Sequence, residues 1–429
     1  MKKQCRKWCK KMLAISGKEM SSQECELAVR IDQDACSRCA VCISTCPYEA
    51  IEGKFTQNKL EEVKISPDKC QACGICQSSC PSSAIKTVYY ESGILVDHVS
   101  QLSIGKGPLN LVIACKGNGP SADEIKKLSQ VRILEDYLTL RIPCLGRVSP
   151  ETILQIVTSN VKHLVLVPCE EDLCKYKEGS KKLHYRYLLL KSLMNDLGYE
   201  SNLLTLEENS VKAEIDQSNC VSCMNCWYAC KYSAIKLNGK DTPSVDPNLF
   251  VGCGVCVGLC PAITIRMKGY DSCQIEDTIV SISKSLQSTI EAEKHPNILV
   301  MYCQWCNFPK LSKNTENIIT ENTDDSNITY LPLPCLGRMD SMHIVQALYS
   351  GFDGVLAVGC RKDSCKMDKI KGNEIAEARI KNLKIILKQL SIDSKLAVDF
   401  VRPEYVDDFS GSINLFINSL KLSKENGDN

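Results

Sequence analysis

The sequence predicts a chain in which two cysteine-rich α+β domains alternate with two parallel-sheet α/β domains, as a tandem duplication. The duplication is visible in Pro-Cys-Leu-Gly-Arg, which occurs around Cys144 and again around Cys335. In both copies a second cysteine follows 25 positions later, at Cys169 and Cys360, and a third after 5 more. A dense cysteine block precedes each copy. Within each copy, short apolar runs alternate with helical patterns, which favours a parallel sheet covered by helices.

The composition is that of an ordinary globular protein of about three domains. The 429 residues are 44% apolar and 24% charged, with a net charge of +1. So small a net charge gives no indication of binding to nucleic acid or to a membrane surface. The longest apolar runs, such as Asn110–Cys115, are much shorter than the ~20 residues of a membrane-spanning helix. The basic N-terminus lacks the apolar stretch of a signal peptide, so we expect a cytoplasmic protein.

The 28 cysteines are the feature that departs most from an ordinary composition. Secreted disulfide scaffolds are also rich in cysteine, but they are usually short chains. This chain is long, and its dense blocks space the cysteines in groups of three. Thiolates that bind metal or iron–sulfur clusters in a reducing compartment are therefore favoured over disulfides.

The first dense block contains two runs of Cys-x2-Cys-x2-Cys-x3-Cys-Pro, which begin at Cys36 and at Cys70. This spacing is the signature of bacterial two-cluster ferredoxins, in which the fourth cysteine of each run binds the cluster of the other run. One 4Fe–4S cluster is expected on Cys36, Cys39, Cys42 and Cys80. A second is expected on Cys70, Cys73, Cys76 and Cys46. A zinc ribbon fits poorly, because it uses paired Cys-x2-Cys knuckles separated by longer gaps.

The second dense block departs from this signature at Phe250, which stands where the first cysteine of the second run belongs. One complete 4Fe–4S cluster remains expected, on Cys220, Cys223, Cys226 and Cys260. The other site keeps three thiolates, from Cys230, Cys253 and Cys256. Three thiolates are compatible with a 3Fe–4S cluster, with a 4Fe–4S cluster that has a foreign ligand, or with no cluster. Cys273 is a candidate for the missing ligand, although a buried cysteine without a ligand role is the commoner outcome.

In the second α/β segment, cysteines follow the ends of predicted strands in NILVMYC, NITYLPLPC and GVLAVGC. Loops at the carboxyl ends of neighbouring parallel strands converge on one edge of a sheet. We therefore expect five cysteines to meet there: Cys303, Cys306, Cys335, Cys360 and Cys365. Helix N-termini that follow such loops favour the negative charge of a thiolate-bound cluster.

Several motifs of this segment, between Tyr302 and Arg379, are those of a known family: YCQWC, PCLGRMD, GVLAVGC, DSC and GNEIAEAR. Over about Pro296–Leu422 the sequence resembles the iron–sulfur delta subunit of methyl-viologen-reducing (F420-non-reducing) hydrogenase. The resemblance implies a 2Fe–2S cluster. It also implies electron transfer between a hydrogenase or formate dehydrogenase and heterodisulfide-reductase-like flavoproteins. Many members have a second cysteine where this chain has Tyr302.

The first α/β segment resembles a degenerate member of the same family. It keeps four cysteines, Cys115, Cys144, Cys169 and Cys174, and four thiolates suffice for a 2Fe–2S cluster. It has Asn118 where Cys306 would fall, and it lacks the GNEIAEAR sequence. A second 2Fe–2S cluster and a structural relic without a cluster are both compatible with this pattern. If both copies bind a cluster, Cys306 is spare or exchangeable.

The expected organisation has five segments. A basic N-terminal segment covers 1–30, and a two-cluster ferredoxin domain covers 31–95. A degenerate delta-subunit-like α/β domain at 108–206 and a second ferredoxin domain at 214–268 follow. A delta-subunit-like α/β domain with a 2Fe–2S site covers 297–422.

The function that these patterns favour is a multi-cluster iron–sulfur electron-transfer subunit of a hetero-oligomer. Its expected cofactors are three 4Fe–4S clusters, a further 4Fe–4S or 3Fe–4S cluster and one 2Fe–2S cluster. The sequence does not decide between the presence and the absence of a second 2Fe–2S cluster. By resemblance, it would relay electrons between a hydrogenase, formate dehydrogenase or other redox enzyme and a heterodisulfide-reductase-like flavoprotein. An electron-bifurcating complex of an anaerobe is the implied setting. No G-x-G-x-x-G motif indicates a flavin site on this chain.

Two other functions remain open from the sequence. The three thiolates of Cys230, Cys253 and Cys256 are compatible with an open iron site in a catalytic reductase, because catalytic metal centres keep a free coordination position. A redox scaffold, in which degenerate sites only shape an interface, is the other. The pattern assigns no role to the isolated cysteines Cys5, Cys9 and Cys25.

Overall fold

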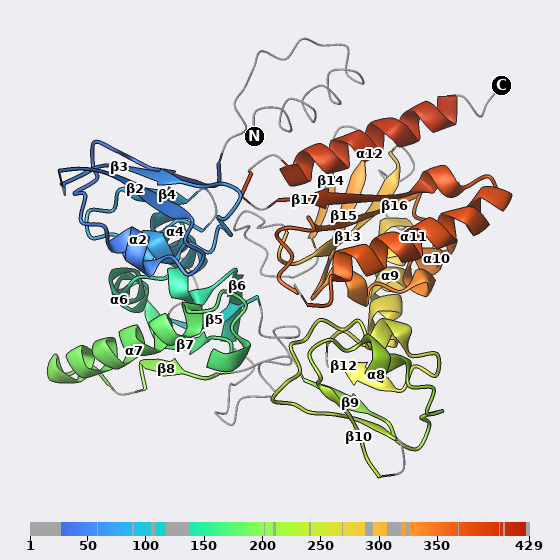
Figure 1. The fold of residues 1–429 in the computed structure, drawn as a ribbon, viewed down its shortest axis with the longest axis horizontal. Coiled ribbons are helices and arrows are strands. Elements are labelled where there is room, and N and C mark those ends of the chain that lie inside the picture. Colours follow the sequence, from blue (N-terminus) through green and yellow to red (C-terminus); the bar gives the residue numbers. More distant parts are fainter. Residues whose placement is uncertain are drawn as a thin grey trace.

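The computed structural model shows four bodies of secondary structure, two on each side of the molecule (Figure 1). The residues that it describes are 27–57, 59–87, 90–103, 108–116, 137–200, 202–208, 212–239, 242–267, 269–287, 295–306, 319–322, 326–367, 369–402, 404–405 and 408–425. Cys5, Cys9, Cys25 and Asn118 lie outside these ranges. Within them, the helices lack the combination of length and apolar character that crossing a membrane requires.

The first ferredoxin-like body consists of short strands and helices joined by the cysteine loops. Its elements are β1 (Val29–Ile31), α2 (Val41–Thr45), β2 (Ile51–Thr56), β3 (Lys59–Ile65), α3 (Ile75–Ser78), β4 (Ile85–Thr87) and α4 (Ser92–Ser103). Strand β1 pairs antiparallel with β4, and β2 pairs antiparallel with β3. The two short helices begin after left-handed residues, Ala40 and Gly74, which lets the chain turn sharply between the cysteines.

The second ferredoxin-like body repeats this plan with smaller strands. Its elements are β9 (Ala213–Ile215), α8 (Asn225–Ala229), β10 (Ile235–Leu237), β11 (Pro243–Val245), the 3-10 turn η3 (Val257–Leu259), β12 (Ile265–Met267) and α9 (Ser272–Gln287). Strand β12 pairs antiparallel with β9, and β10 pairs antiparallel with β11. Helix α9 leaves this body and ends at Gln287, and residues 288–294 lie outside the described ranges.

The first α/β body is a four-stranded sheet with the order β6-β5-β7-β8, and all its strands are parallel. Its elements are β5 (Leu109–Cys115), β6 (Tyr137–Ile142), η1 (Leu145–Arg147), α6 (Pro150–Thr158), β7 (Val161–Val167), η2 (Glu171–Leu173), α7 (Gly179–Asp196) and β8 (Leu204–Leu206). Ser149 caps α6 by accepting a hydrogen bond from Thr152 N, and Pro150 takes the first helical position, where no N–H is needed.

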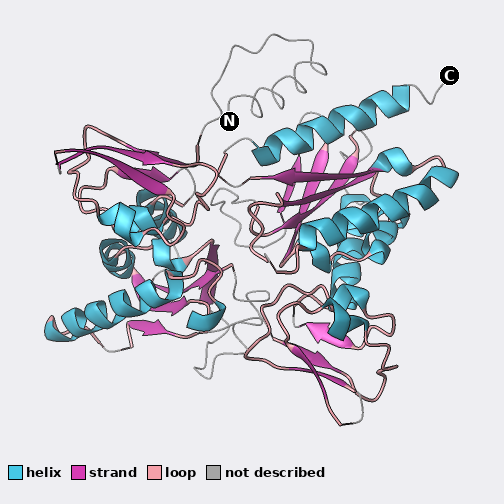
Figure 2. Ribbon diagram, viewed as in Figure 1, coloured by secondary structure: helices cyan, strands magenta, loops and turns pink. Residues whose placement is uncertain are grey.

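The second α/β body has a five-stranded sheet with the order β14-β15-β13-β16-β17, in which only β14 is antiparallel. Its elements are β13 (Asn297–Cys303), β14 (Ile319–Asn322), β15 (Asn327–Leu333), η5 (Leu336–Arg338), α10 (Ser341–Tyr349), β16 (Gly354–Cys360), α11 (Gly372–Gln389), η6 (Asp393–Lys395), β17 (Leu396–Val401) and α12 (Asp408–Glu425). Helix α12 lies on one side of the sheet, with α10 and α11 on the other (Figure 2). Every residue of β16 is buried, which explains its continuous apolar sequence.

Each ferredoxin-like body packs on its own α/β body through an arginine of the repeated Pro-Cys-Leu-Gly-Arg. Arg147 lies against Gly74, where an added Cβ would be 2.9 Å from the arginine Cβ. Arg338 lies against Gly254 in the same way, with the added Cβ 2.7 Å from the arginine Cδ. Both glycines have a positive φ, and both follow the second cysteine position of a cluster loop. A glycine is required here because any side chain would separate the two bodies.

The two arginines also donate hydrogen bonds to the segment that leaves the ferredoxin-like body. Arg338 donates from Nε and Nη2 to Tyr270 O at 2.9 and 2.7 Å, and from Nη2 to Ser272 Oγ at 3.1 Å. Arg147 donates from Nη2 to Thr87 Oγ1 at 3.2 Å and lies over the ring of Tyr90. Both arginines thus hold a ferredoxin-like body against its α/β body.

Substitution Arg338→Lys is expected to weaken this interface by on the order of 2–3 kcal/mol, because lysine cannot donate the forked set of hydrogen bonds to Tyr270 and Ser272. The denaturant midpoint of the iron-loaded protein should fall. Arg266→Lys is the matched control, since Arg266 is exposed on β12 of the same body and should change the midpoint little. Equal midpoints for the two variants would contradict the structural role of Arg338.

The two halves of the chain face each other with approximate twofold symmetry. In Figure 1 the two ferredoxin-like bodies lie at diagonally opposite corners, as do the two α/β bodies. One hydrophobic cluster joins the halves, since it contains Ile75 and Tyr176 together with Trp305. The Tyr176 and Trp305 rings meet edge to face with centroids 5.7 Å apart. The Lys116 ammonium donates across the same boundary to Gln304 O at 3.4 Å.

Candidate iron–sulfur sites

The first ferredoxin-like body gathers its eight cysteines around two cavities. The outer site is lined by the four cysteines Cys36, Cys39, Cys42 and Cys80. The inner site, which lies toward the α/β body, is lined by the four cysteines Cys46, Cys70, Cys73 and Cys76. Each site combines three cysteines of one run with the last cysteine of the other, which is the crossed grouping that the spacing predicts.

The two sites differ in their access to solvent. Cys39 of the outer site is exposed, whereas Cys73 of the inner site is 7% exposed. Burial raises the pKa of the Cys70 thiol to about 11 and that of Cys73 to about 12. Iron binding must therefore displace protons from these thiols, and the bound cluster would be shielded from water.

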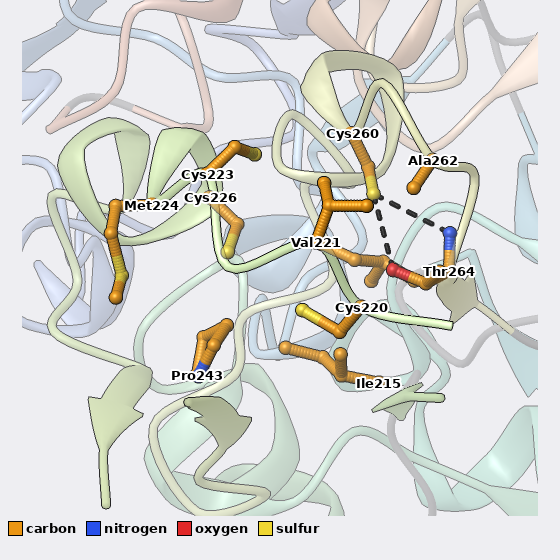
Figure 3. A pocket seen from close by; sticks show the side chains of 11 residues that line it. Ile215, Cys220, Val221, Cys223, Met224, Cys226, Pro243, Cys260, Ala262 and Thr264 are labelled. Carbon is orange, nitrogen blue, oxygen red and sulfur yellow. Dashed lines mark hydrogen bonds between the residues drawn. The ribbon is translucent and has the colours of Figure 1, made fainter. Parts of the chain in front are cut away.

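The second ferredoxin-like body has one site with four cysteines, and Figure 3 shows it from close by. Its outer site is lined by Cys220, Cys223, Cys226 and Cys260. The backbone N–H of Thr264 donates to Cys260 Sγ at 3.4 Å, and Thr264 Oγ1 lies 3.3 Å from the same sulfur (Figure 3). These contacts favour the thiolate and lower the pKa of Cys260 against the opposing effect of burial. Cys223 is exposed, as Cys39 is in the first body.

The inner site of the second body does not fit a cluster with four thiolates. Phe250 is 3% exposed and packs in the hydrophobic cluster that contains Cys256 and, at its edge, Cys230. An aromatic ring at this position supplies no ligand atom. Cys273 is exposed in the first turn of α9 and is not part of the hydrophobic clusters that contain Cys253 and Cys256.

The second α/β body brings its cysteines together at the carboxyl edge of the sheet. Cys303 ends β13 and Cys360 ends β16, and their sulfur atoms lie 3.4 Å apart. Cys306 Sγ donates to Cys303 O at 3.0 Å. Cys335 precedes η5, and its thiol interacts electrostatically with those of Cys303 and Cys365. These five thiols, four of them buried and Cys365 half-buried, form one group, which we call the second α/β site.

The N-terminus of α11 closes the second α/β site. Gly372, its first residue, has no side chain, and an added Cβ would lie 2.2 Å from Cys335 Sγ. Asn373 Nδ2 donates to Cys360 O at 2.8 Å, which fixes the strand end that holds this cysteine. Backbone N–H groups of Gly372 and Asn373 also favour the thiolate of Cys365, although burial raises its pKa to about 11. A helix N-terminus with free N–H groups stabilises a negatively charged cluster.

The first α/β body builds the same site from four thiols. Cys115, Cys144, Cys169 and Cys174 form one group whose members interact electrostatically. Leu145 N donates to Cys115 Sγ at 3.1 Å, and Ser180 N donates to Cys174 Sγ at 3.4 Å. Gly179 begins α7, and an added Cβ there would lie 2.4 Å from Cys144 Sγ. We call this group the first α/β site.

The two α/β sites share a feature that the sequence motifs alone do not reveal. The first copy lacks the letters GNEIAEAR, but it keeps the glycine and the arginine at the same spacing, as Gly179 and Arg186. Arg186 Nη1 donates to Gly146 O and Val148 O at 2.8 and 3.1 Å. Arg379 of the second copy donates to the equivalent carbonyls. The spacing Gly-x6-Arg was the available signal, hidden by the divergence of the residues between.

The residues of these sites fit iron–sulfur clusters. Thiols are the ligands of such clusters, and N–H···S contacts together with helix N-termini stabilise their negative charge. Both α/β sites leave space for sulfur atoms at a helix start only because a glycine stands there. The fold and these thiol groups define an iron–sulfur protein that has ferredoxin-like and parallel-sheet domains.

The chain belongs to the family of the methyl-viologen-reducing hydrogenase delta subunit, whose model matches residues 111–226 and 298–422, together more than half of the chain. Two 4Fe–4S dicluster domain models match as well, at 35–84 and 213–267. The resemblance inferred from YCQWC, PCLGRMD and the other motifs is thereby confirmed, and it extends to both α/β bodies.

Curated relatives come from two kinds of complex. One is a subunit of the ferredoxin/F(420)H(2)-dependent CoB-CoM heterodisulfide reductase of Methanosarcina acetivorans, to which the chain is 30% identical over 217 residues, 50% of this chain and 26% of that protein. A subunit of the ferredoxin:CoB-CoM heterodisulfide reductase of Methanosarcina mazei is 29% identical with the same coverage. The iron–sulfur subunit of F420-non-reducing hydrogenase from Archaeoglobus profundus is 38% identical over 68 residues, 16% of this chain and 50% of that protein. The chain thus spans about a quarter of the length of the two reductase relatives.

Proposed function

We propose that the chain is an electron-transfer subunit that carries several iron–sulfur clusters. The observation that carries the proposal is the continuity of its thiol sites. In the first half the inner site adjoins the first α/β site, since Cys73 and Cys144 pack in one hydrophobic cluster. In the second half Cys253 and Cys335 pack together in another hydrophobic cluster. Clusters supply one-electron redox chemistry, and the protein sets their spacing and potential.

The exposed cysteines favour the two outer sites as the places where partner proteins exchange electrons with this chain. Cys39 and Cys223 are exposed at the two outer sites, which lie in the two ferredoxin-like bodies at opposite corners of the molecule (Figure 1). Cys144, Cys335 and the other α/β thiols are buried or half-buried. Buried sites protect a reduced cluster from water, and surface sites let a partner approach.

The cluster content that we propose follows the thiols present. The three complete ferredoxin-type sites hold 4Fe–4S clusters, and the two α/β sites hold 2Fe–2S clusters. The inner site beside Phe250 holds no four-thiolate cluster. In the α/β bodies the residues that both copies share are the ligands, and Cys306 of the second copy is an additional thiol.

The partners are proposed from the names of the relatives. Proteins of heterodisulfide reductase and of F420-non-reducing hydrogenase both resemble this chain. We therefore infer that it links a hydrogenase, formate dehydrogenase or similar donor to a heterodisulfide-reductase-like flavoprotein, within an electron-bifurcating complex. The flavin would belong to the partner, because the sequence has no dinucleotide-binding motif.

The test is a cluster inventory of anaerobically purified protein. Chemical analysis should find about 16 iron atoms per chain, from three four-iron and two two-iron clusters. After reduction, low-temperature EPR should show the signals of both cluster types. Mixing with an oxidised flavoprotein of the heterodisulfide reductase type should reoxidise the clusters and remove these signals. Reduced protein with no cluster signal would end the proposal.

The alternative of a catalytic reductase is less well supported by the structure. Its iron site would rest on Cys230, Cys253 and Cys256, but Phe250 packs in the same cluster. Arg338 and its α/β body cover the adjoining loop at Gly254. A substrate would have to displace the Phe250 ring and Arg338 to reach an iron atom there.

A further inference from the structure

Two lysines at equivalent positions of the duplication cross from one half of the molecule to the other. Lys175 follows Cys174, and Lys366 follows Cys365. The Lys175 ammonium donates to Val251 O at 2.5 Å, and the Lys366 ammonium donates to Gln71 Oε1 at 2.5 Å. Each lysine thus leaves the last cysteine of its own α/β site and ends on the ferredoxin-like body of the other half.

The acceptors of the two lysines are also equivalent. Gln71 follows Cys70, and Val251 follows Phe250, the position that corresponds to Cys70. Both hydrogen bonds therefore end at the residue that follows the first ligand position of an inner site. The reciprocal arrangement makes a chance surface contact an inadequate explanation, because the same residue of each copy reaches the same residue of the other.

Lys366 lies between two complete thiol groups. Its charge interacts with Cys70 and Cys73 of the inner site in the first half and with Cys360 of the second α/β site. The rings of Tyr48 and Tyr176 hold the ammonium from the sides, with centroids 4.9 and 4.5 Å away. Aromatic faces attract a cation and fix its place without neutralising it.

One acidic group also acts on Lys366. Glu404 is 3% exposed and stabilises the charged form of the lysine, but Arg402 lies 3.8 Å from the same carboxylate. Glu404 is therefore shared between Lys366 and Arg402. Lys175 has a different set of neighbours, since its charge interacts with Cys169 and Cys174 in its own half and with Cys253 and Cys335 in the other.

We propose that Lys366 and Lys175 are crossed electrostatic bridges, each of which raises the reduction potential of cluster sites in both halves of the molecule. The inference rests on the proposed electron-transfer function. Reduction adds negative charge to a cluster, and a nearby cation in a dry environment stabilises that charge. Because Phe250 removes a ligand near Lys175, the two bridges are unequal: Lys366 acts on an inner site with four cysteines, and Lys175 acts beside the incomplete one.

Redox titration of the complete chain, followed by low-temperature EPR, tests this proposal. In Lys366→Gln the midpoint potentials of two clusters should fall, those of the first inner site and of the second α/β site. The clusters of the two outer sites should keep their potentials. Lys366→Arg retains the charge and should restore both potentials toward the wild-type values. Iron content should match the wild type in both variants.

Lys175→Gln is the matched control within the same molecule. It should lower the potentials of the two α/β sites and leave the first inner site unchanged. Gln71→Glu is a second variant, which keeps Lys366 and adds a negative charge beside it. It should lower the same two potentials as Lys366→Gln, and it tests the proposal if Lys366→Gln folds poorly.

The outcomes separate this inference from the proposed function. Wild-type protein without reducible clusters would overturn both. Normal cluster signals whose potentials do not respond to Lys366→Gln and Gln71→Glu would overturn the bridge alone. A shift confined to one half of the molecule would also contradict it, because the crossing contact predicts effects in both.

Discussion

Phe250→Cys is expected to add one 4Fe–4S cluster, because it restores the missing ligand of the second inner site. Cys230, Cys253 and Cys256 already stand at the other three ligand positions. Phe250 packs in the same cluster as Cys256 and Cys230, so a thiol at this position would lie among the other ligand positions. Iron analysis of anaerobically purified protein should therefore rise by about four atoms per chain. EPR of the reduced variant should gain the signal of an additional 4Fe–4S centre.

Phe250→Ala separates the effect of the ligand from the effect of space. It removes the same ring without adding a thiol, so it should leave the iron content unchanged and cost about 3–5 kcal/mol of stability through the cavity that it creates. Adding Cys273→Ser to Phe250→Cys should not reduce the gain of iron, because Cys273 is exposed on α9. Wild-type protein that already contains this cluster would refute our assignment of the site.

The ligand groups of the ferredoxin-like bodies are the part of the site that sequence reasoning predicts best. A cubane needs several thiols within a few ångströms, so its ligands recur at short spacings that remain visible without a structure. The structure lines its cavities with the groups that begin at Cys36 and Cys220. The meeting of Cys335 with Cys303 was also predictable, because parallel strands end at one edge of a sheet.

The contacts between bodies were not predictable from the sequence. Arg147 and Arg338 follow a conspicuous motif, but their partners, such as Tyr270, are set by how two domains pack. The same holds for Lys366, whose acceptor Gln71 lies 295 positions away along the chain. Contacts of this kind leave no periodic pattern and no fixed spacing, since each requires only one polar side chain at a position that the tertiary structure selects.

Gly372→Ala is expected to abolish the cluster of the second α/β site. The added methyl group would lie 2.2 Å from Cys335 Sγ, far inside van der Waals contact, at a helix start that is fixed by packing on η5. Either the thiol or the helix must move, and each would lose the geometry that a 2Fe–2S cluster needs. Iron content should fall by about two atoms per chain, and the corresponding EPR signal should disappear.

Gly93→Ala is the control for a helical glycine without a close neighbour. Gly93 lies in α4, and an added Cβ there meets no heavy atom within 4 Å. This variant should keep all its iron and should not lose stability, because the added methyl group meets no neighbour. Loss of iron in Gly93→Ala would show that the effect of Gly372→Ala is not specific to its site.

Gly179→Ala applies the same steric block to the first copy and so decides between a working site and a relic. The added Cβ would lie 2.4 Å from Cys144 Sγ, so a cluster bound there should be lost, with about two iron atoms per chain. A relic without a cluster would lose no iron in Gly179→Ala while Gly372→Ala still does. We expect equal losses, because Leu145 and Ser180 still donate to the thiols of the first copy and Arg186 still holds its loop.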